Sequence, residues 1–240
     1  MSADVPPIPD MDLSRFPRQV TSNKLVLGTG SGFRDVTIDA EVSRSNWSWN
    51  ARALDVDSDG YLDLFVGNGY GLGSVANFSL LPDIQVHSNV LYRNISGEKF
   101  ESSAHKFGLT DYLNTPSFVV LDVDLDGDMD LITYAQVGGL RLYENQVTSG
   151  SSLTFQLSDG MGNRGCVGCK IILETDRGRQ IREIKLSGGF LSYDEARLHF
   201  GVVAGDSVRS VRVVWSTGEQ TPLDVPFSSG RHYRVTRKSR

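Results

Sequence analysis

The sequence predicts an all-β protein in which repeated units of short strands are followed by a small C-terminal antiparallel β-domain. Three observations lead to this prediction. Glycine fills 25 of 240 positions, and the 39% hydrophobic and 22% charged residues are typical of a folded chain. Few stretches have the periodicity of an amphipathic helix. Two different markers recur at nearly one spacing in the first 150 residues, as they do in propellers and solenoids.

The first marker is an aspartate-rich motif between two apolar segments. It begins at Asp55 and again at Asp122, 67 residues later. The second marker is an apolar segment that leads through a glycine turn to an aromatic residue. It begins at Leu25 and again at Val90, 65 residues later. We therefore expect each unit to consist of strands on either side of the aspartate loop and of the glycine turn.

The last 90 residues follow another pattern. Apolar segments at 165–173 and 180–186 flank a polar turn, which predicts a β-hairpin. Segments 208–215 and 231–235 combine arginine with apolar residues, which is typical of strands with one solvated face. The chain is thus predicted to have three parts, which are an N-terminal segment at 1–22, a repeat region at 23–150 and a β-domain at 151–240.

Charge is distributed unevenly between these parts. Residues 1–150 carry 10 Lys and Arg against 20 Asp and Glu, a net of −10, whereas residues 151–240 carry 14 against 9, a net of +5. An acidic block of this size repels itself unless cations neutralise it. No apolar run approaches the ~18 residues of a membrane helix. The arginines of the basic part are scattered and lack a base-stacking motif, so we expect no nucleic-acid partner.

Both aspartate motifs have the form D-x-D-x-D-G-x-x-D, which places oxygen ligands at alternate positions of a short loop. Ca²⁺ takes ~6–8 oxygens and tolerates irregular geometry, Mg²⁺ prefers fewer carboxylates, and Zn²⁺ would need His or Cys. We predict two calcium sites. The first would use the side chains of Asp55, Asp57, Asp59 and Asp63 and the carbonyl of Tyr61. The second would use the side chains of Asp122, Asp124, Asp126 and Asp130 and the carbonyl of Asp128.

The surroundings of these motifs resemble a known family. An EF-hand would need Glu where Val66 and Thr133 stand, and helices on either side. The final aspartate followed by Leu-Phe-Val or Leu-Ile-Thr instead resembles the FG-GAP/VCBS repeats of integrin-like β-propellers. Residues 90–94 and 97–100 are similar to the segment that closes such a repeat.

The C-terminal part resembles the ASPIC/UnbV domain. The similarity rests on four segments, which are 163–168, 190–192, 198–201 and 211–218. FG-GAP/VCBS repeats followed by ASPIC/UnbV are the layout of the cartilage acidic protein family and its bacterial relatives. The resemblance implies partial propeller blades, structural calcium, an extracellular or periplasmic location and a recognition or adhesion role with a protein or glycan partner. It implies no settled reaction.

A propeller needs at least ~4 blades to close, and residues 1–150 supply about two and a half. We therefore expect the chain to be the C-terminal portion of a longer protein, with the missing N-terminal blades as its partner. The alternative is that several copies of the chain complete one ring. The sequence also shows no signal-peptide pattern.

Some features leave alternatives open. Cys166 and Cys169 stand where the family has Gly and Ala, and they would form either a local disulfide or a pair of buried thiols. His199 lies between two apolar residues and is expected to be a hydrogen-bonded structural residue. An enzyme such as a calcium-assisted hydrolase or cyclase is the alternative to a binding protein, although no nucleophile–base pair is recognisable.

Overall fold

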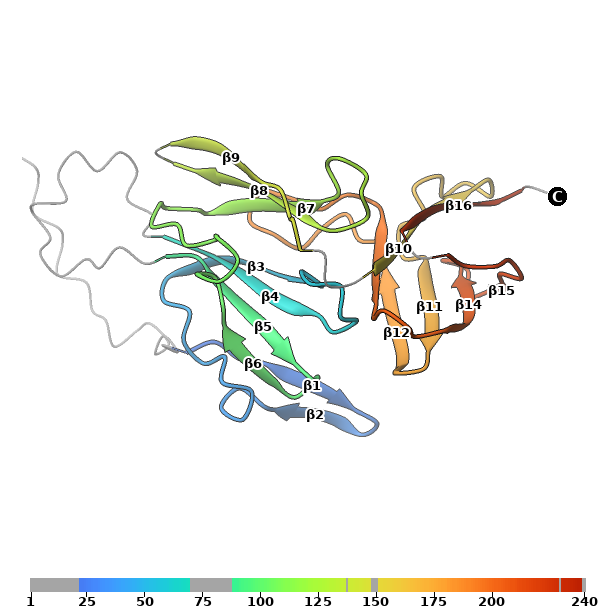
Figure 1. The fold of residues 1–240 in the computed structure, drawn as a ribbon. Coiled ribbons are helices and arrows are strands. Elements are labelled where there is room, and N and C mark those ends of the chain that lie inside the picture. Colours follow the sequence, from blue (N-terminus) through green and yellow to red (C-terminus); the bar gives the residue numbers. More distant parts are fainter. Residues whose placement is uncertain (1–21, 70–87, 137, 148–150, 229, 239–240) are drawn as a thin grey trace, which may run out of the picture.

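The computed structural model describes residues 22–69, 88–136, 138–147, 151–228 and 230–238, and in them it has the predicted all-β fold (Figure 1). The strands form five sheets, three in the repeat region and two in the C-terminal part. The sheets of the repeat region lie on the left of Figure 1, and those of the C-terminal part lie on the right.

The repeat region contains three antiparallel sheets. The first is a hairpin of β1 (Val26–Thr29) and β2 (Gly32–Asp35). The second has four strands, β3 (Ser48–Leu54), β4 (Asp63–Asn68), β5 (Val90–Ile95) and β6 (Lys99–Ser102). The third has three strands, β7 (Ser117–Leu121), β8 (Asp130–Ala135) and β9 (Gly139–Tyr143).

The second sheet packs against the third, and the segment after β2 packs against the second. Strand β3 alternates buried and less buried residues, as expected for a strand with one face in a core. One apolar cluster joins the second and third sheets, and its Phe65 and Phe118 rings meet edge to face at 4.8 Å between centroids. Another cluster joins the segment after β2 to the second sheet through Val36, Val66 and Tyr92.

The C-terminal part is a pair of sheets around one core. One sheet has the order β13 (Leu198–Val202), β10 (Ser151–Asp159), β16 (Arg231–Arg237). The other has the order β12 (Gly178–Glu183), β11 (Lys170–Thr175), β14 (Val208–Val214), β15 (Gln220–Pro222). Phe155, Phe200, Ile171 and Val213 are fully buried between them. The pairing is antiparallel with one exception, because β10 and β16 run parallel.

The predicted hairpin is present, but its first strand begins later than expected. Strand β11 starts at Lys170 rather than at residue 165, because Cys166 has a φ of 50° and residues 163–169 form turns. Thr175 pairs with Gly178 at the predicted turn. Most of the predicted segment 1–22 and the region just before Ser151 lie outside the described residues.

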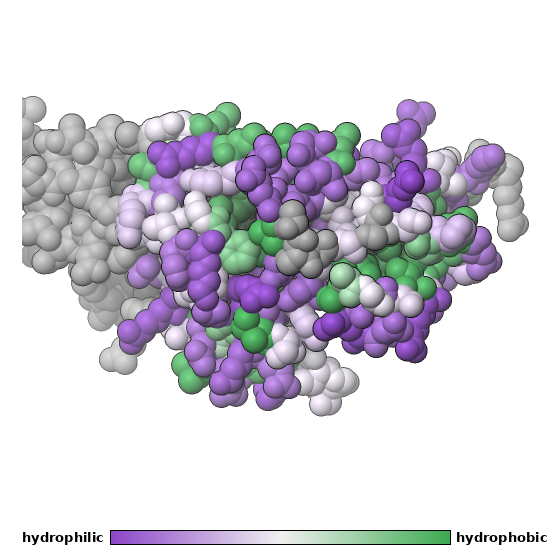
Figure 2. Space-filling view, viewed as in Figure 1, coloured by the Kyte–Doolittle hydropathy of each residue, from purple (hydrophilic) through white to green (hydrophobic). Residues whose placement is uncertain are grey.

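The surface is mixed in character. Figure 2 shows hydrophilic side chains over much of this face and apolar ones in separate patches. Within the described part of the chain, we find no helix with the length and apolar character needed to cross a membrane.

Candidate metal-binding loops

The two aspartate motifs form the loops β3–β4 (loop 1, residues 55–62) and β7–β8 (loop 2, residues 122–129). Each loop closes an antiparallel pair in the same register, with Leu54 opposite Asp63 and Leu121 opposite Asp130. Their backbones match as well. Positive φ angles occur at Ser58 and Gly60 in loop 1 and at the corresponding positions, Leu125 and Gly127, in loop 2. The shared motif therefore produces one backbone conformation in two places.

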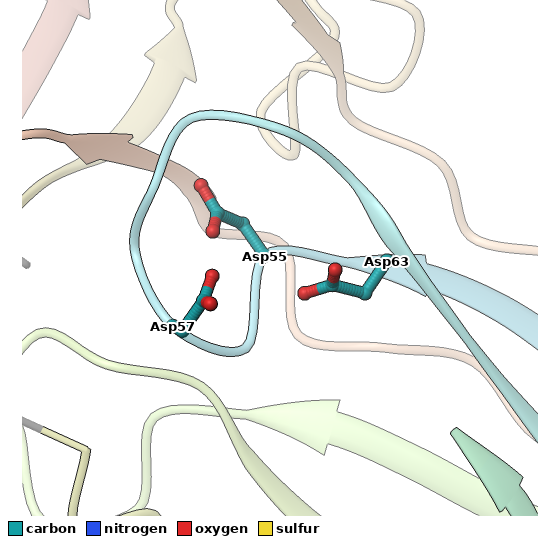
Figure 3. Close-up of side chains that lie close together, drawn as sticks. All are labelled: Asp55, Asp57 and Asp63. Atoms are coloured by element: carbon teal, nitrogen blue, oxygen red, sulfur yellow. The ribbon is translucent and has the colours of Figure 1, made fainter. Parts of the chain in front are cut away.

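Loop 1 gathers three of its carboxylates. Oxygen atoms of Asp55, Asp57 and Asp63 lie within 4.8 Å of one another, and all three residues are buried. Figure 3 shows the three side chains grouped where the loop curves around them. The predicted ligand Asp59 is not in this group, and its Oδ1 accepts a hydrogen bond from the Tyr61 amide at 2.8 Å. The structure thus brings together three of the four predicted side chains.

Hydrogen bonds from the backbone hold the first and last aspartates of loop 1. Asp55 accepts from the amides of Asp59 and Gly60, at 3.0 and 2.9 Å. Asp63 accepts from the amides of Val56 and Asn94, at 2.8 and 2.7 Å. These contacts fix the two carboxylates before any ion binds, which lowers the entropy cost of forming a metal site.

Loop 2 repeats this arrangement. Asp122, Asp124 and Asp130 have oxygens within 4.8 Å of one another, but Asp124 is exposed. The carboxylate of Asp126 is again directed at the backbone, and it accepts from the Asp128 amide at 3.0 Å. Asp130 accepts from the amides of Val123 and Asn145, both at 2.8 Å.

The electrostatics of both loops favour a cation. Burial and neighbouring aspartates raise the pKa of Asp55 and Asp63 in loop 1 to about 7, and the pKa of Asp128 in loop 2 to about 7. The same causes, burial first, raise the pKa values of Asp59 and Asp130. A raised pKa in a group of carboxylates means that too little positive charge lies nearby to stabilise their ionised forms.

The donor set fits a hard cation. One oxygen of Asp122 and one of Asp128 are buried without a hydrogen-bond partner among the described residues. A buried, unpaired carboxylate oxygen is costly, and a bound cation would satisfy it. The grouped ligands are all oxygens, as Ca²⁺ requires. The carboxylates present therefore fit calcium.

Three arginines supply part of the missing charge. Arg93 on β5 donates from Nε to Asp57 at 2.5 Å. Arg197 donates from Nη1 to Asp122 at 3.3 Å, and the Asp122 side chain is fully buried. The charges of Arg182 and Asp55 also interact. Both Arg182 and Arg197 belong to the C-terminal part, so each loop faces an arginine from the other half of the chain.

The loops pack directly on the C-terminal sheets. A Cβ on Gly201 would lie 2.1 Å from Oδ2 of Asp55, so only glycine fits beneath loop 1. A Cβ on Gly127 would lie 2.5 Å from Oγ of Ser152, which places loop 2 against β10. His232 on β16 also lies against loop 2, because its Nε2 is 2.8 Å from the Leu125 carbonyl oxygen.

A second set of contacts joins the segment after β12 to the second and third sheets of the repeat region. Arg52, only 8% exposed, donates from Nε to Asp194 at 2.6 Å, and Asp194 accepts from the Val120 amide at 3.0 Å. The rings of Trp49 and Phe190 lie 5.1 Å apart. The sequence showed segments 190–192 and 198–201 only as similar to the ASPIC/UnbV domain. In the structure both segments contact the repeat region.

The cysteine pair lies outside this contact. Both cysteines are free thiols and fully buried, and the Cys169 amide donates to the Cys166 carbonyl at 2.8 Å. Burial and the neighbouring Cys169 raise the pKa of Cys166 to about 12, so this thiol is a poor nucleophile. The other predicted state, a local disulfide formed in an oxidising compartment, stays a prediction.

Comparison with known proteins identifies the C-terminal part. Residues 160–238 match the model of a family described as ASPIC and UnbV. This match agrees with the resemblance seen in the sequence and covers the two sheets that contact the loops, except for β10, which ends just before the match begins. The search of curated proteins gave no match.

Proposed function

We propose that this chain is a calcium-binding recognition protein, in which two Ca²⁺ ions stabilise FG-GAP/VCBS-like repeats against an ASPIC/UnbV domain. One observation carries the proposal. Two loops 67 residues apart share a motif, a strand register and a backbone conformation, and each gathers three carboxylates. Because like charges repel at such distances, a bound cation would stabilise this repeated geometry.

The bound ions would have a structural role. They would neutralise carboxylates that lie directly against Gly201 and Arg197, and so strengthen the contact between the repeat region and the C-terminal sheets. A ligand that binds only the folded state stabilises it by RT ln(1 + [L]/Kd). Calcium at extracellular or periplasmic concentrations would then act as part of the fold, and a protein or glycan partner would bind the assembled surface.

The test is a thermal unfolding experiment with and without chelator. EDTA should lower the Tm of the wild-type protein by several degrees, and added Ca²⁺ should restore it. The double variant Asp57→Ala/Asp124→Ala should lose this response, because it removes one grouped carboxylate from each loop.

A control variant separates calcium binding from the mere loss of two acids. Asp39→Ala/Asp224→Ala removes two exposed aspartates far from both loops in sequence, and it should keep the full response. An unchanged wild-type Tm in EDTA, together with no heat of Ca²⁺ binding in calorimetry, would overturn the proposal.

A further inference from the structure

A cleft lies where the two halves of the chain meet. Its volume is about 470 Å³, within the range of roughly 300–1,000 Å³ that small-molecule sites occupy. One wall comes from β3, loop 1 and Val120, and the other from β12, the segment after it and the start of β13. Apolar side chains such as Leu62, Ile181 and Leu198 form much of the lining. The cleft can therefore hold a small ligand with an apolar face.

Most of the charged residues in the lining neutralise one another. Arg52 pairs with Asp194 at 2.6 Å. Arg197 pairs with Glu195 at 2.9 Å as well as with Asp122. Lys170 lies 3.5 Å from Glu183. The lining charges left over are Asp55, Arg182 and Lys185.

Arg182 is the important cation among these three. Its guanidinium donates only to neutral oxygens, those of Gln180 and Ile181, each at 3.2 Å. No carboxylate of the described residues lies within ion-pair distance of it. Burial lowers the pKa of Arg182, and the negative charge of Asp55 opposes this effect. If calcium binds loop 1, as proposed above, the charge of Asp55 is neutralised by the ion, and Arg182 and Lys185 then lack a counter-charge.

His199 adds a neutral polar group to the same cleft. The residue is 7% exposed, and its Nε2 has no hydrogen-bond partner among the described residues. Burial, with the charge of Arg182, lowers the pKa of His199 to about 3, so the ring is neutral. The backbone of Gly127 opposes this lowering. A neutral ring with its proton on Nδ1 presents Nε2 as an acceptor, which suits a hydroxyl group.

We propose that this cleft binds a small hydroxylated carboxylate, such as a uronic acid, with the carboxylate at Arg182 and Lys185 and a hydroxyl at His199. A guanidinium binds a carboxylate through two parallel hydrogen bonds, and an apolar wall suits the C–H face of a sugar ring. The same chemistry is offered by a free acid and by the end of an acidic glycan chain.

The test uses the full chain in saturating Ca²⁺ and isothermal calorimetry. D-glucuronate should bind, and glucose, which lacks the carboxylate, should bind at least about tenfold more weakly, as expected for loss of a charge-assisted contact. Arg182→Gln and Lys185→Gln should each weaken glucuronate binding, and Lys185 is exposed enough that its replacement leaves folding intact. Arg209→Gln, at an exposed arginine that pairs with Asp176, is the matched control.

A second arm separates this proposal from the calcium proposal on which it rests. Asp55→Asn removes the competing charge without any ion, so this variant should bind glucuronate even in EDTA. If Asp55→Asn binds glucuronate in EDTA but the wild-type chain binds no calcium, only the proposed calcium sites are refuted. The cleft proposal would be overturned if glucuronate bound neither to Asp55→Asn in EDTA nor to the wild-type chain in calcium. It would also be overturned if glucose bound as tightly as glucuronate.

A third arm identifies the source of the acid. A tetrasaccharide ending in a uronic acid should bind more tightly than glucuronate if the ligand is a glycan end. Tighter binding of the monosaccharide would identify a free acid as the ligand.

Discussion

Loops 1 and 2 share a motif and a backbone, but their surroundings differ. In loop 1 all three grouped carboxylates are buried, whereas in loop 2 the middle one, Asp124, is exposed. Arg93 pairs with Asp57 in loop 1. The corresponding position next to loop 2 is Glu144, because Tyr92 and Tyr143 occupy the same place in the strand pairing. The nine-residue motif thus determines the local conformation, while the neighbouring strand determines the charge that an arriving cation meets.

The two loops also contact the C-terminal part in different ways. Loop 1 packs on the backbone of β13 at Gly201, and loop 2 packs on the side chains of Ser152 and His232. Side chains can rotate away from an added atom, but a paired strand cannot. Loop 1 should therefore be less tolerant of change at this contact than loop 2.

The largest expected effect comes from Gly201→Ala. The added Cβ would lie 2.1 Å from the Asp55 carboxylate and 2.6 Å from the Ser58 backbone, so loop 1 must shift. Overpacking of this kind costs about 1–3 kcal/mol of unfolding free energy, which chemical denaturation would measure. Calcium binding by loop 1 should weaken at the same time, while that of loop 2 should not.

Gly165→Ala is the matched control, because the nearest atom to its added Cβ is 4.0 Å away. If both glycine variants were equally stable and bound calcium equally, the packing of loop 1 on β13 would not contribute to the site.

The sequence predicted the positions of the loops but not their environment. The D-x-D-x-D-G-x-x-D pattern is local, so strand register and backbone conformation follow from it. The orientation of Asp59 does not, because its carboxylate can bind either an ion or the nearby Tyr61 amide. Arg93 and Arg197 are separated from their aspartates by 36 and 75 residues. Contacts over such separations depend on how sheets pack, and one sequence does not specify that.

A smaller effect should appear in the pH dependence of the calcium-free protein. The pKa of Asp63 is about 7 in the folded chain against an ordinary value of 3.8, so the folded state binds the extra proton. Its contribution to stability is present at low pH and is lost as the pH rises through 7. Between pH 6 and pH 8 the wild-type chain should therefore lose about 1 kcal/mol relative to Asp63→Asn, measured by denaturation in EDTA.

Asp130→Asn provides the comparison in loop 2. The direction should be the same, because the pKa of Asp130 is also raised, but the change should be smaller, since solvent reaches the cluster at Asp124. Saturating calcium should abolish both differences for the wild-type chain, because the ion holds the carboxylates ionised. A larger change for Asp130→Asn than for Asp63→Asn would contradict the assignment of loop 1 as the more buried site.

The smallest effect should distinguish Arg93 from Glu144. Arg93 competes with a cation for Asp57, so Arg93→Gln should raise the calcium affinity of loop 1. Glu144→Gln should lower that of loop 2, because it removes an attractive charge. A single charge at a partly exposed site is worth about 1 kcal/mol, or about fivefold in Kd.

Calorimetry would measure calcium binding by each loop alone, in variants where Asp124→Ala removes binding by loop 2 or Asp57→Ala removes binding by loop 1. A lower calcium affinity in Arg93→Gln would show instead that Arg93 holds Asp57 in position for the ion. The two loops would then differ in how they position their ligands rather than in how strongly their charges attract calcium.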